Sequence, residues 1–527
     1  MKLIFFVYFA AFTTSTNSYK FLIYSPFLGH SHVNFLGNMA DVLSEAGHDV
    51  TVVMPEMDEE QLERTGTKIT KRIIRTPGDP RSSQLLKEAT LKDTFWSKPT
   101  SPFTMLQMMN SLSNILAWQC ETLINDDDLL QMLENEKFDV GISEAYYICG
   151  LGLFEALKIP STIAVVSNTH MDSVLYAIGE PNFPSFMPSV MGTTGDKMTF
   201  VERLKNVVAL VISRTIVAYL NNNEVTVLRK KYATFKDSTE LIAQSSFIFT
   251  NSNPYLDYPR PTLHKTITIG GFAVTRSLKE AHALDEEWNS VLNARPRTVL
   301  VSFGSVTKSI YMPENFKKTL LDVFASMPET TFVWKYEDLT NITITESHPN
   351  VFLSEWVPQI PLLKDERLTA FITHGGIGST NEVAFTGKPA IVVPIFGDQM
   401  RNSHMLAKHG GALLLEKSEL GDFNKLRNAL QEVLDNPSYA KNAMLLSQIL
   451  HNQPISPQEL LLRHAEFAAR FGQIPNLDSY GRHLSLVQYY SIDIVATLIA
   501  VPILFLVFSA FIVRKCFWRR VTKLKPE

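Results

Sequence analysis

The feature that most constrains the fold is a short apolar run that leads into a glycine-rich turn and then into a helical pattern. Residues Thr369–Thr373 (TAFIT) have the composition of a buried parallel strand. The turn that follows, His374–Thr380, contains three glycines, and Asn381–Phe385 has a helical pattern. Small residues let the backbone approach an anion, and free N–H groups at a helix N-terminus favour negative charge. The segment therefore predicts a phosphate site on an α/β sheet.

A second apolar run predicts the neighbouring strand. Pro389–Ile395 (PAIVVPI) ends at Gly397-Asp398-Gln399. Parallel strands end at the same edge of a sheet, which is where open α/β sheets bind ligands. Trp356 lies upstream of both strands, and its flat ring can stack on a base. The order is an aromatic ring for the base, a glycine-rich turn for the phosphates, and the pair Asp398-Gln399 for hydroxyl groups. This order indicates a nucleotide-sugar pocket.

The segment from Trp356 to Gln399 resembles the signature of the UDP-glycosyltransferases, the family that includes the UDP-glucuronosyltransferases of the endoplasmic reticulum. The positions that match are Trp356, Gln359, His374, Gly376, Ser379, Glu382, Pro389, Pro394, Asp398 and Gln399. The likeness extends over nearly the whole chain and is weakest between about residues 60 and 135. It implies the α/β fold called GT-B, in which two Rossmann-like domains with parallel sheets face each other across a cleft.

The resemblance also implies a role for each donor-site residue. Trp356 would stack on uracil, and Gln359 would contact the nucleoside. His374 and the turn Gly376–Ser379 would hold the diphosphate, and Glu382 would accept the ribose hydroxyls. The sugar hydroxyls and the diphosphate would be contacted further along the chain, by Asp398, Gln399 and Asn402.

Three other positions belong to the predicted donor site. The strand pattern Thr298–Phe303 is followed by Gly304-Ser305, so Ser305 is a second candidate for phosphate contact. Many relatives carry Asn where this chain has Gly378, so the polar contact at that position is taken over by backbone or lost. Arg260 occupies the position at which glucuronate-using relatives carry an arginine proposed to face the sugar carboxylate.

The first half of the chain is expected to supply the base. Lys20–Ser25 and Asp49–Met54 have strand patterns, and His32–Ala46 between them has a helical pattern closed by Gly47. His32 then lies at the junction of a strand and a helix. It matches the catalytic histidine of the family, and His30 is the near competitor. An imidazole can remove the proton of an acceptor hydroxyl at neutral pH.

Such a base needs a carboxylate that fixes its tautomer. Phe138–Ile142 has a strand pattern and is followed by Ser143-Glu144. Animal relatives have Asp at the position of Glu144, so the charge is kept here on a longer side chain. Glu144 is therefore the expected partner of His32. The alternative is that Glu144 is an acidic residue at the end of a strand with no role in catalysis.

Aromatic and methionine side chains in Phe95–Trp118 and Phe183–Met187 indicate an apolar acceptor cavity. The acidic run Asp126–Asp128 precedes a helical pattern and is predicted to cap that helix instead of binding a metal. With three cysteines in the chain, Cys120 and Cys149 could pair, but two buried free thiols are expected.

Both ends of the chain carry targeting patterns. Met1-Lys2 precedes the apolar run Leu3–Phe12, which is typical of a signal peptide. Ile494–Val513 is long enough to span a bilayer, and the cations after it predict a cytosolic tail. Asn341 begins a tripeptide for lumenal N-glycosylation. The last five residues resemble a dilysine retrieval signal. We therefore expect a single-pass type I protein of the endoplasmic reticulum membrane with a lumenal body.

These observations divide the chain into six parts. They are a signal peptide (1–18), an acceptor-binding domain (19–275), a UDP-sugar-binding domain (285–450), returning helices with a juxtamembrane segment (451–491), a transmembrane helix (492–513) and a cytosolic tail (514–527).

The resemblance implies an inverting transferase that moves a sugar, with glucuronic acid favoured, from a UDP-sugar to a hydroxyl of a small lipophilic acceptor. It implies no cofactor and no metal, the UDP-sugar being a co-substrate. A formal charge of −4 without a basic stripe gives no support for nucleic-acid binding. Two alternatives remain: a UDP-glucose-dependent enzyme, and a non-catalytic UDP-sugar binder that modulates sibling enzymes. The sequence leaves homo- or hetero-oligomerisation open.

Overall fold

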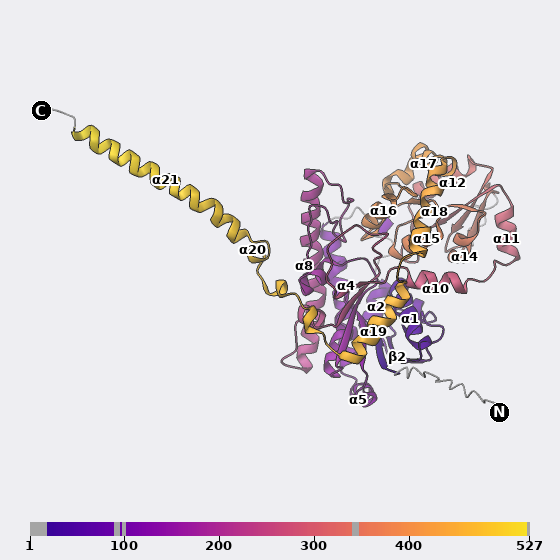
Figure 1. Ribbon diagram of the computed structural model, residues 1–527. Coiled ribbons are helices and arrows are strands. Elements are labelled where there is room, and N and C mark those ends of the chain that lie inside the picture. The colour runs from indigo at the N-terminus through magenta and orange to yellow at the C-terminus, as the bar shows by residue number, and fades with distance from the viewer. Residues whose placement is uncertain (1–17, 89–94, 97–101, 340–346, 524–527) are drawn as a thin grey trace, which may run out of the picture.

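The computed structural model describes residues 18–88, 95–96, 102–339 and 347–523. Three predicted features lie outside the described residues. They are residues 1–17 of the predicted signal peptide, the glycosylation candidate Asn341, and residues 524–527 of the tail. Figure 1 shows two lobes, one formed by the indigo-to-magenta part of the chain and the other by the orange part. A long helix leads away from both lobes to the C-terminus.

The first lobe is built on a parallel sheet that has seven strands within the described residues, in the order β3-β2-β1-β4-β5-β6-β7. Most residues of these strands are buried, as expected for a parallel sheet covered by helices. The strands are β1 (Lys20–Tyr24), β2 (Asp49–Pro55), β3 (Arg72–Thr76), β4 (Val140–Glu144), β5 (Ser161–Val166), β6 (Phe247–Thr250) and β7 (Thr266–Thr268).

The second lobe has a parallel sheet of six strands in the part of the chain described, in the order β10-β9-β8-β11-β12-β13. Its strands are β8 (Arg297–Ser302), β9 (Thr330–Lys335), β10 (Val351–Ser354), β11 (Leu368–Thr373), β12 (Ala390–Val392) and β13 (Ala412–Leu414). Both orders follow the doubly wound pattern of Rossmann-like sheets. The prediction of two Rossmann-like domains with parallel sheets is therefore confirmed.

Helices cover the faces of both sheets. The first domain contains α1 (His30–Glu45), α2 (Pro80–Glu88), α4 (Pro102–Ile124), α5 (Asp127–Glu136), α6 (Cys149–Ala156), α7 (Asp172–Ile178), α8 (Phe200–Lys231) and α9 (Ser238–Ala243). The linker and second domain contain α10 (Phe272–Glu280), α11 (Glu286–Asn293), α12 (Glu314–Ala325), α14 (Gln359–Lys364), α15 (Ile377–Thr386), α16 (Gln399–Ala407), α17 (Phe423–Asp435) and α18 (Pro437–His451). The chain ends with α19 (Pro457–Phe471), α20 (Leu486–Tyr489) and α21 (Ile492–Lys523). Short 3-10 turns lie at Glu59–Gln61, Ser309–Tyr311, Lys417–Gly421, Pro475–Leu477 and Tyr480–His483.

The order of the strands fixes where ligands can bind. In the first sheet β1 pairs with both β2 and β4, and in the second sheet β8 pairs with both β9 and β11. The chain leaves these central strands in opposite directions, which opens a crevice beyond their carboxyl ends. The functional side chains are therefore expected after β1 and β4 in one domain, and after β8 and β11 in the other.

The expectation of two free thiols is wrong, because Cys120 and Cys149 form a disulfide. Their Cα atoms lie 5.6 Å apart, within the usual range for such a bond. Helix α4 brings Cys120 onto the first residue of α6, a neighbourhood that sequence spacing does not reveal. Glu224 lies beside the pair and accepts hydrogen bonds from the backbone N–H groups of Ile148 and Cys149. The prediction that the acidic run Asp126–Asp128 caps a helix is confirmed. Asp126 accepts a hydrogen bond from the Leu129 N–H and caps α5.

Phe95 and Trp96 belong to the first half of the chain but pack on the second domain. Trp96 is almost fully buried in the second-domain core, and its indole N–H donates to the Lys308 carbonyl at 3.0 Å. The ring of Phe95 stacks on Phe396 with 4.0 Å between centroids. The sequence predicts that Trp96 contributes to an acceptor cavity, but it lies in the core of the second domain instead. It fastens one domain to the other.

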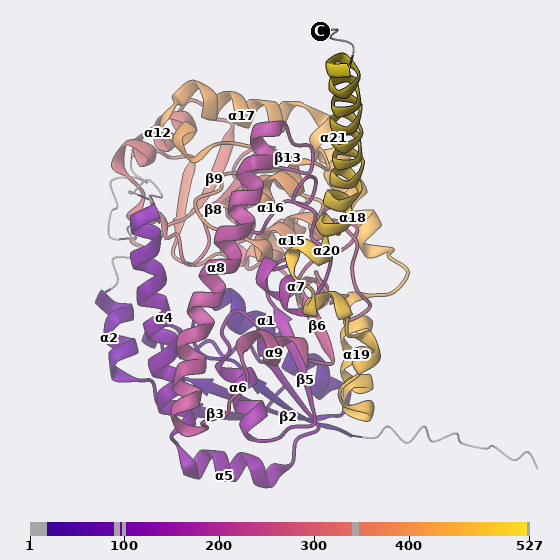
Figure 2. The same ribbon diagram turned by 90° about the vertical axis from the view of Figure 1, so that its left-hand side faces the viewer.

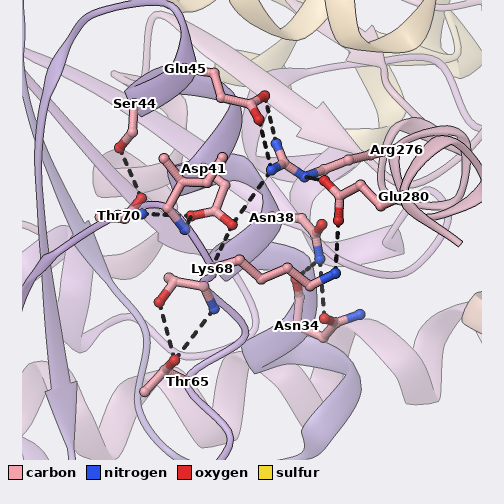
Figure 3. Close-up of polar contacts among 12 residues, drawn as sticks. Asn34, Asn38, Asp41, Ser44, Glu45, Thr65, Lys68, Thr70, Arg276 and Glu280 are labelled. Carbon is pink, nitrogen blue, oxygen red and sulfur yellow. Dashed lines mark hydrogen bonds and ion pairs between the residues drawn. The ribbon is translucent and has the colours of Figure 1, made fainter. Parts of the chain in front are cut away.

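The linker helix α10 is fastened to α1 by charged side chains (Figure 3). The guanidinium of Arg276 is almost fully buried and pairs with both carboxylate oxygens of Glu45, at 2.7 and 2.9 Å. It also lies 2.9 Å from Glu280 and 3.8 Å from Asp41. The Asp41 carboxylate accepts three backbone N–H groups from residues 68–70. This cluster ties the body of α1 to the segment that connects the two domains (Figure 3).

The C-terminal helices return to the first domain before the chain leaves the body. Leu461, Ala465 and Ala468 of α19 are fully buried in the first-domain core. Two of the helices described are long and apolar enough to cross a membrane, namely Phe200–Lys231 and Ile492–Arg520. The second has no buried residues in its apolar window and projects from the body in Figure 1. It is one helix that continues past the predicted end of the span at residue 513.

Candidate active site

A cavity of about 580 Å³ lies between the two domains. The first domain contributes residues that follow β1, β4 and β5, and the second contributes residues that follow β8, β11 and β12. The two crevices predicted by the strand orders therefore open into one shared cleft.

His32 and Glu144 meet on the first-domain side of this cleft. Gly29, whose φ is 76°, precedes α1, and His32 lies in the first turn of that helix. Glu144 is the last residue of β4 and is 1% exposed. The Nδ1 atom of His32 is 3.0 Å from Oε1 of Glu144 and 2.9 Å from Oγ of Ser167. Because an ionised carboxylate only accepts hydrogen bonds, the proton belongs on Nδ1, and Nε2 is left as the basic nitrogen.

The surroundings of His32 raise its pKa above the ordinary value of 6.5. Burial by itself lowers this pKa, but the charge and hydrogen bond of Glu144 outweigh it, with a contribution from Asp398 of the other domain. His30 has the opposite environment, because burial and the charges of Arg64 and Lys335 lower its pKa. His30 also contacts the edge of Trp356 and has no carboxylate partner among its recorded contacts. The geometry therefore favours His32 over His30 as the base.

On the second-domain side, His374 is held between two glycines. A Cβ at Gly304 would lie 2.7 Å from Cε1 of His374, and one at Gly376 would lie 2.5 Å from Nε2. Gly304 also has a φ of +88°, so both backbone and space require glycine there. Burial and the charge of Lys335 lower the pKa of His374 to about 4. The imidazole is therefore neutral at physiological pH.

Helix α15 directs its N-terminus into the cleft. Its first residues, from Gly376 to Ser379, line the cavity, and no side chain caps the helix. Its first N–H groups are thus available to an anion such as a diphosphate. A Cβ built at Gly378 meets nothing within 4 Å, so the space for a side chain at this position is empty.

Gln359, Ser379 and Glu382 form a connected group on α14 and α15. The side-chain amide of Gln359 donates to Oγ of Ser379 at 3.2 Å and to the Glu382 carboxylate. Burial raises the pKa of Glu382 to about 7, although the Gln359 hydrogen bond opposes the shift. Trp356 lies at the rim, 49% exposed, with the Arg64 guanidinium 4.2 Å from its ring centroid. All four side chains line the cleft or its rim, as expected for a nucleoside site.

Asp398 and Gln399 line the cleft at the start of α16. Burial raises the pKa of Asp398, whose carboxylate accepts hydrogen bonds from Asn402 of its own helix and from Asn168 of the first domain. The Oε1 atom of Gln399 accepts the backbone N–H groups of Ile395 and Phe396 at 2.8 and 3.0 Å. The amide of Gln399 thus braces the loop through its oxygen and keeps its NH₂ group for another partner.

Two predicted donor-site residues do not line the cavity. Asn402 is fully buried and acts on Asp398 instead of facing the cleft. Arg260 lies in a buried group of charges, where it lowers the pKa of His170 and of Asp257. Arg401 is in the same group and pairs with Asp257. Arg260 matches the family in position, but in the structure its charged neighbours include the acids Asp257, Glu180 and Asp172.

Sequence reasoning missed several polar cleft residues, of which three make informative contacts. Ser167 and Asn168 follow β5, and they contact His32 and Asp398 respectively. Lys335 ends β9, lines the cleft, and lies with its Nζ 5.5 Å from the Trp356 ring centroid. The position of each at the carboxyl end of a strand is the signal that could have identified them.

The remaining wall of the cleft is apolar. Its lining includes Met109, Met171, Val190, Met191, Ile216 and Val217, all from the first domain. These side chains come from α4, α8 and the loops beside α7. This half of the cavity can accept a nonpolar molecule next to His32.

Comparison with known proteins places the chain among transferases. The family model described as "UDP-glucoronosyl and UDP-glucosyl transferase" matches residues 23–526. The chain is 29% identical over 485 residues to the Caenorhabditis elegans protein ugt-56, covering 89% of this chain and 90% of that one. It is 28% identical over 500 residues to UDP-glucuronosyltransferase 1A7 of Mus musculus, covering 92% and 91%.

Solved structures share the fold at low identity. A UDP-glucosyltransferase from Polygonum tinctorium aligns with a TM-score of 0.57 and 16% identity, over 86% of this chain and 98% of that one. The glycosyltransferase VinC aligns with a TM-score of 0.56 and 16% identity, over 85% and 100%. The two facing parallel-sheet domains are therefore the GT-B fold.

Proposed function

The chain belongs to the UDP-glycosyltransferase family and uses a UDP-sugar as donor, and from that premise we propose that it transfers glucuronic acid to a hydroxyl of a small lipophilic acceptor. The observation that carries the proposal is the contact of 3.0 Å between His32 Nδ1 and Glu144 Oε1, opposite the donor residues of the second domain. A pure UDP-sugar binder has no need of such an oriented base.

The proposed reaction is a single displacement. Nε2 of His32 accepts the proton of the acceptor hydroxyl, and the oxygen attacks the anomeric carbon of the sugar. The bond from that carbon to the UDP oxygen breaks on the opposite side, so UDP leaves with the electron pair and the configuration inverts. Glu144 stabilises the imidazolium that forms on His32.

The donor side stabilises the leaving group. The N–H groups at the start of α15 and the neutral His374 donate toward the charge that develops on the diphosphate. Glu382 and Gln359 would hold the ribose and the base, with Trp356 stacked on uracil. Asp398 and Gln399 would bind the sugar hydroxyls. No metal is part of this scheme, so a chelator should leave turnover unchanged.

UDP-glucose is the second candidate donor. The name of the mouse relative supports glucuronic acid. The placement of Arg260 favours glucose, because this arginine lies outside the described lining of the cleft and among buried acids. Turnover measured with both donors at equal concentration decides between them.

We also propose that α21 anchors the protein in the endoplasmic reticulum membrane with the body in the lumen and the tail in the cytosol. The exposed apolar window of α21 and the basic residues that follow it support this orientation. Protease treatment of sealed microsomes would remove only the tail.

The test of the mechanism is His32→Ala, with His30→Ala as the matched control. We expect His32→Ala to abolish transfer while UDP still binds, because the base is lost and the second domain is untouched. His30→Ala should retain transfer, with at most weaker UDP binding through its contact with Trp356. Normal turnover in His32→Ala would contradict the assignment and would favour another base, whereas the non-catalytic alternative predicts no turnover even in the wild type.

A further inference from the structure

Lys417 is a cation on the same side of the cleft as Asp398. Strand β13 pairs in parallel with β12, with Leu414 opposite Val392, so the two strands end at the same edge of the second sheet. The chain leaves β12 toward Asp398 and leaves β13 toward Lys417, and both residues line the cleft. Figure 2 shows β13 and α16, the helix that follows Asp398, in the same upper lobe. Lys417 therefore lies on the side of the cleft that is proposed to bind the sugar.

Two contacts bring Lys417 to the loop that carries Asp398. The Lys417 ammonium donates to the Phe95 carbonyl at 2.6 Å, and the Phe95 ring stacks on Phe396 with 4.0 Å between centroids. Phe396 precedes Gly397-Asp398 in the chain, and all of these residues line the cleft. In the part of the chain that the structure describes, this is the one hydrogen bond of an ammonium with three N–H donors, so two donors remain for a ligand.

The acids close to Lys417 in sequence are engaged with other groups. Glu416 and Glu419 form a capping box around the turn Lys417–Gly421, and Glu419 also pairs with Lys425 at 2.7 Å. Among the described residues, no carboxylate forms an ion pair with Lys417, which is half-buried. Burial lowers the pKa of its ammonium, and no neighbouring charge opposes that shift. An anion beside it would stabilise the charged form that burial disfavours.

The other lysine of the cleft already has an acidic partner. Lys335 and Lys417 are the two lysines in the described lining, which contains no arginine. The Lys335 ammonium donates to Glu337 at 3.0 Å, and its charge lowers the pKa of His374, the residue proposed to face the diphosphate. Arg260 lies outside this lining. Lys417 is thus the cation that remains for an anionic group at the sugar end of the cleft.

We propose that Lys417 binds the carboxylate of the sugar on the UDP donor and thereby selects a uronic acid over a neutral hexose. The proposal rests on the proposed function, because it takes the second domain as the UDP-sugar site and glucuronic acid as the sugar transferred. A carboxylate is what distinguishes glucuronic acid from glucose, and an ammonium that is partly removed from water binds such a group more strongly than one in open solvent. The cation that Arg260 was predicted to supply then comes from the carboxyl end of β13.

The first experiment measures donor binding without turnover. Calorimetric titration of the full-length protein with UDP, UDP-glucose and UDP-glucuronate gives the affinity that each sugar adds to UDP. Lys417→Met removes the charge and keeps an apolar stem, so we expect the affinity for UDP-glucuronate to fall about 10- to 150-fold with the other two affinities unchanged. Lys417→Arg keeps the charge and should retain the preference for UDP-glucuronate. Lys441→Met, at an exposed lysine of α18, is the matched control.

The titrations also separate the possible roles of Lys417. An equal loss for all three nucleotides in Lys417→Met would mean that the lysine only supports the pocket through Phe95, and would overturn the proposal. Three unchanged affinities would overturn it too. The same holds if the wild type binds UDP-glucuronate no more tightly than UDP-glucose.

The second experiment uses turnover to decide which substrate carries the carboxylate. With a neutral phenol as acceptor, Lys417→Met should raise the KM for UDP-glucuronate and leave kcat/KM for UDP-glucose at the wild-type value. At saturating UDP-glucuronate, the KM of a phenol that bears a carboxylate should stay unchanged. A raised KM for that acidic acceptor alone would assign the cation to the acceptor and refute the proposal.

Failure of the proposed function gives a different result. No turnover with either donor in the wild type would contradict the proposed function, and the titrations would still decide the role of Lys417. Normal transfer of glucuronic acid by both the wild type and Lys417→Met, with the same KM, would leave the proposed function intact and overturn the role of Lys417.

Discussion

Replacing Glu144 by Gln gives the sharpest test of the base. The substitution keeps the shape of the side chain and removes only the charge from a carboxylate that is 1% exposed and 3.0 Å from His32 Nδ1. A hydrogen bond to a charged group contributes about 1.5–3 kcal/mol, so loss of the charge weakens the contact that holds the proton on His32. The pKa of His32 should therefore fall in the variant.

The sign of the effect on activity follows from the role of a base. His32 must be neutral to accept a proton, so kcat/KM of the wild type should fall as the pH drops through a pKa above 6.5. In Glu144→Gln burial still lowers the pKa of His32 and the charge that raised it is gone, so the acidic limb should move to lower pH. The plateau should fall by about 10²–10⁴, because the imidazolium formed during transfer is no longer stabilised.

The assay is UDP release over pH 5–9 at limiting acceptor, for the wild type, Glu144→Gln and Glu144→Asp. The aspartate variant keeps the charge, so its acidic limb should stay close to that of the wild type. A lower plateau with an unmoved limb in Glu144→Gln would mean that Glu144 only positions His32. Unchanged plateau and limb would refute the reasoning, since the carboxylate would then have no part in the proton transfer.

Three other changes test the rest of the molecule. Trp356→Ala should weaken UDP binding about 5- to 150-fold, since base stacking contributes about 1–3 kcal/mol; calorimetric titration measures it, and unchanged affinity would exclude the stack. Glu224 has a folded pKa of about 7 against an ordinary 4.5, so the folded state binds the extra proton and stability should fall as the pH rises between these values. Glu224→Gln should lose this dependence in thermal unfolding, and a parallel loss in both proteins would contradict the assignment. Cys120→Ser with Cys149→Ser should lower stability by about 2–4 kcal/mol, read from denaturant unfolding against the wild type with its disulfide intact.

Most of the fold could be predicted because apolar runs and glycines act locally. The runs that became β8 and β11 are short, rich in β-branched residues and followed two residues later by glycine, a pattern typical of a parallel strand that leads into a helix. The disulfide could not be predicted in this way, because it depends on how α4 crosses α6. The same limit applies to Trp96, whose burial in the opposite domain depends on how the two domains meet.

The same distinction between local pattern and tertiary contact holds for the residues of the candidate site. Residues of the second domain that share one loop or helix, such as His374, Gly376 and Glu382, line the cleft because the local chain direction places them there. Arg260 lies outside the described lining of the cleft, because a match in position says nothing about where a side chain lies in the fold. Its neighbours Asp257, Glu180 and Asp172 come close to it only in the folded chain. Ser167 and Asn168 were missed for the converse reason, since they have no distinctive local pattern.

The contacts across the cleft link the two halves of the mechanism. Asp398 belongs to the second domain, yet it accepts a hydrogen bond from Asn168 of the first domain and contributes to the raised pKa of His32. The proposed base therefore owes part of its raised pKa to a carboxylate of the other domain. An open cleft would separate His32 from Asp398 and leave Glu144 as its remaining carboxylate neighbour. Bringing the domains together would then raise the basicity of His32, so that proton removal is favoured in the geometry in which the sugar can be transferred.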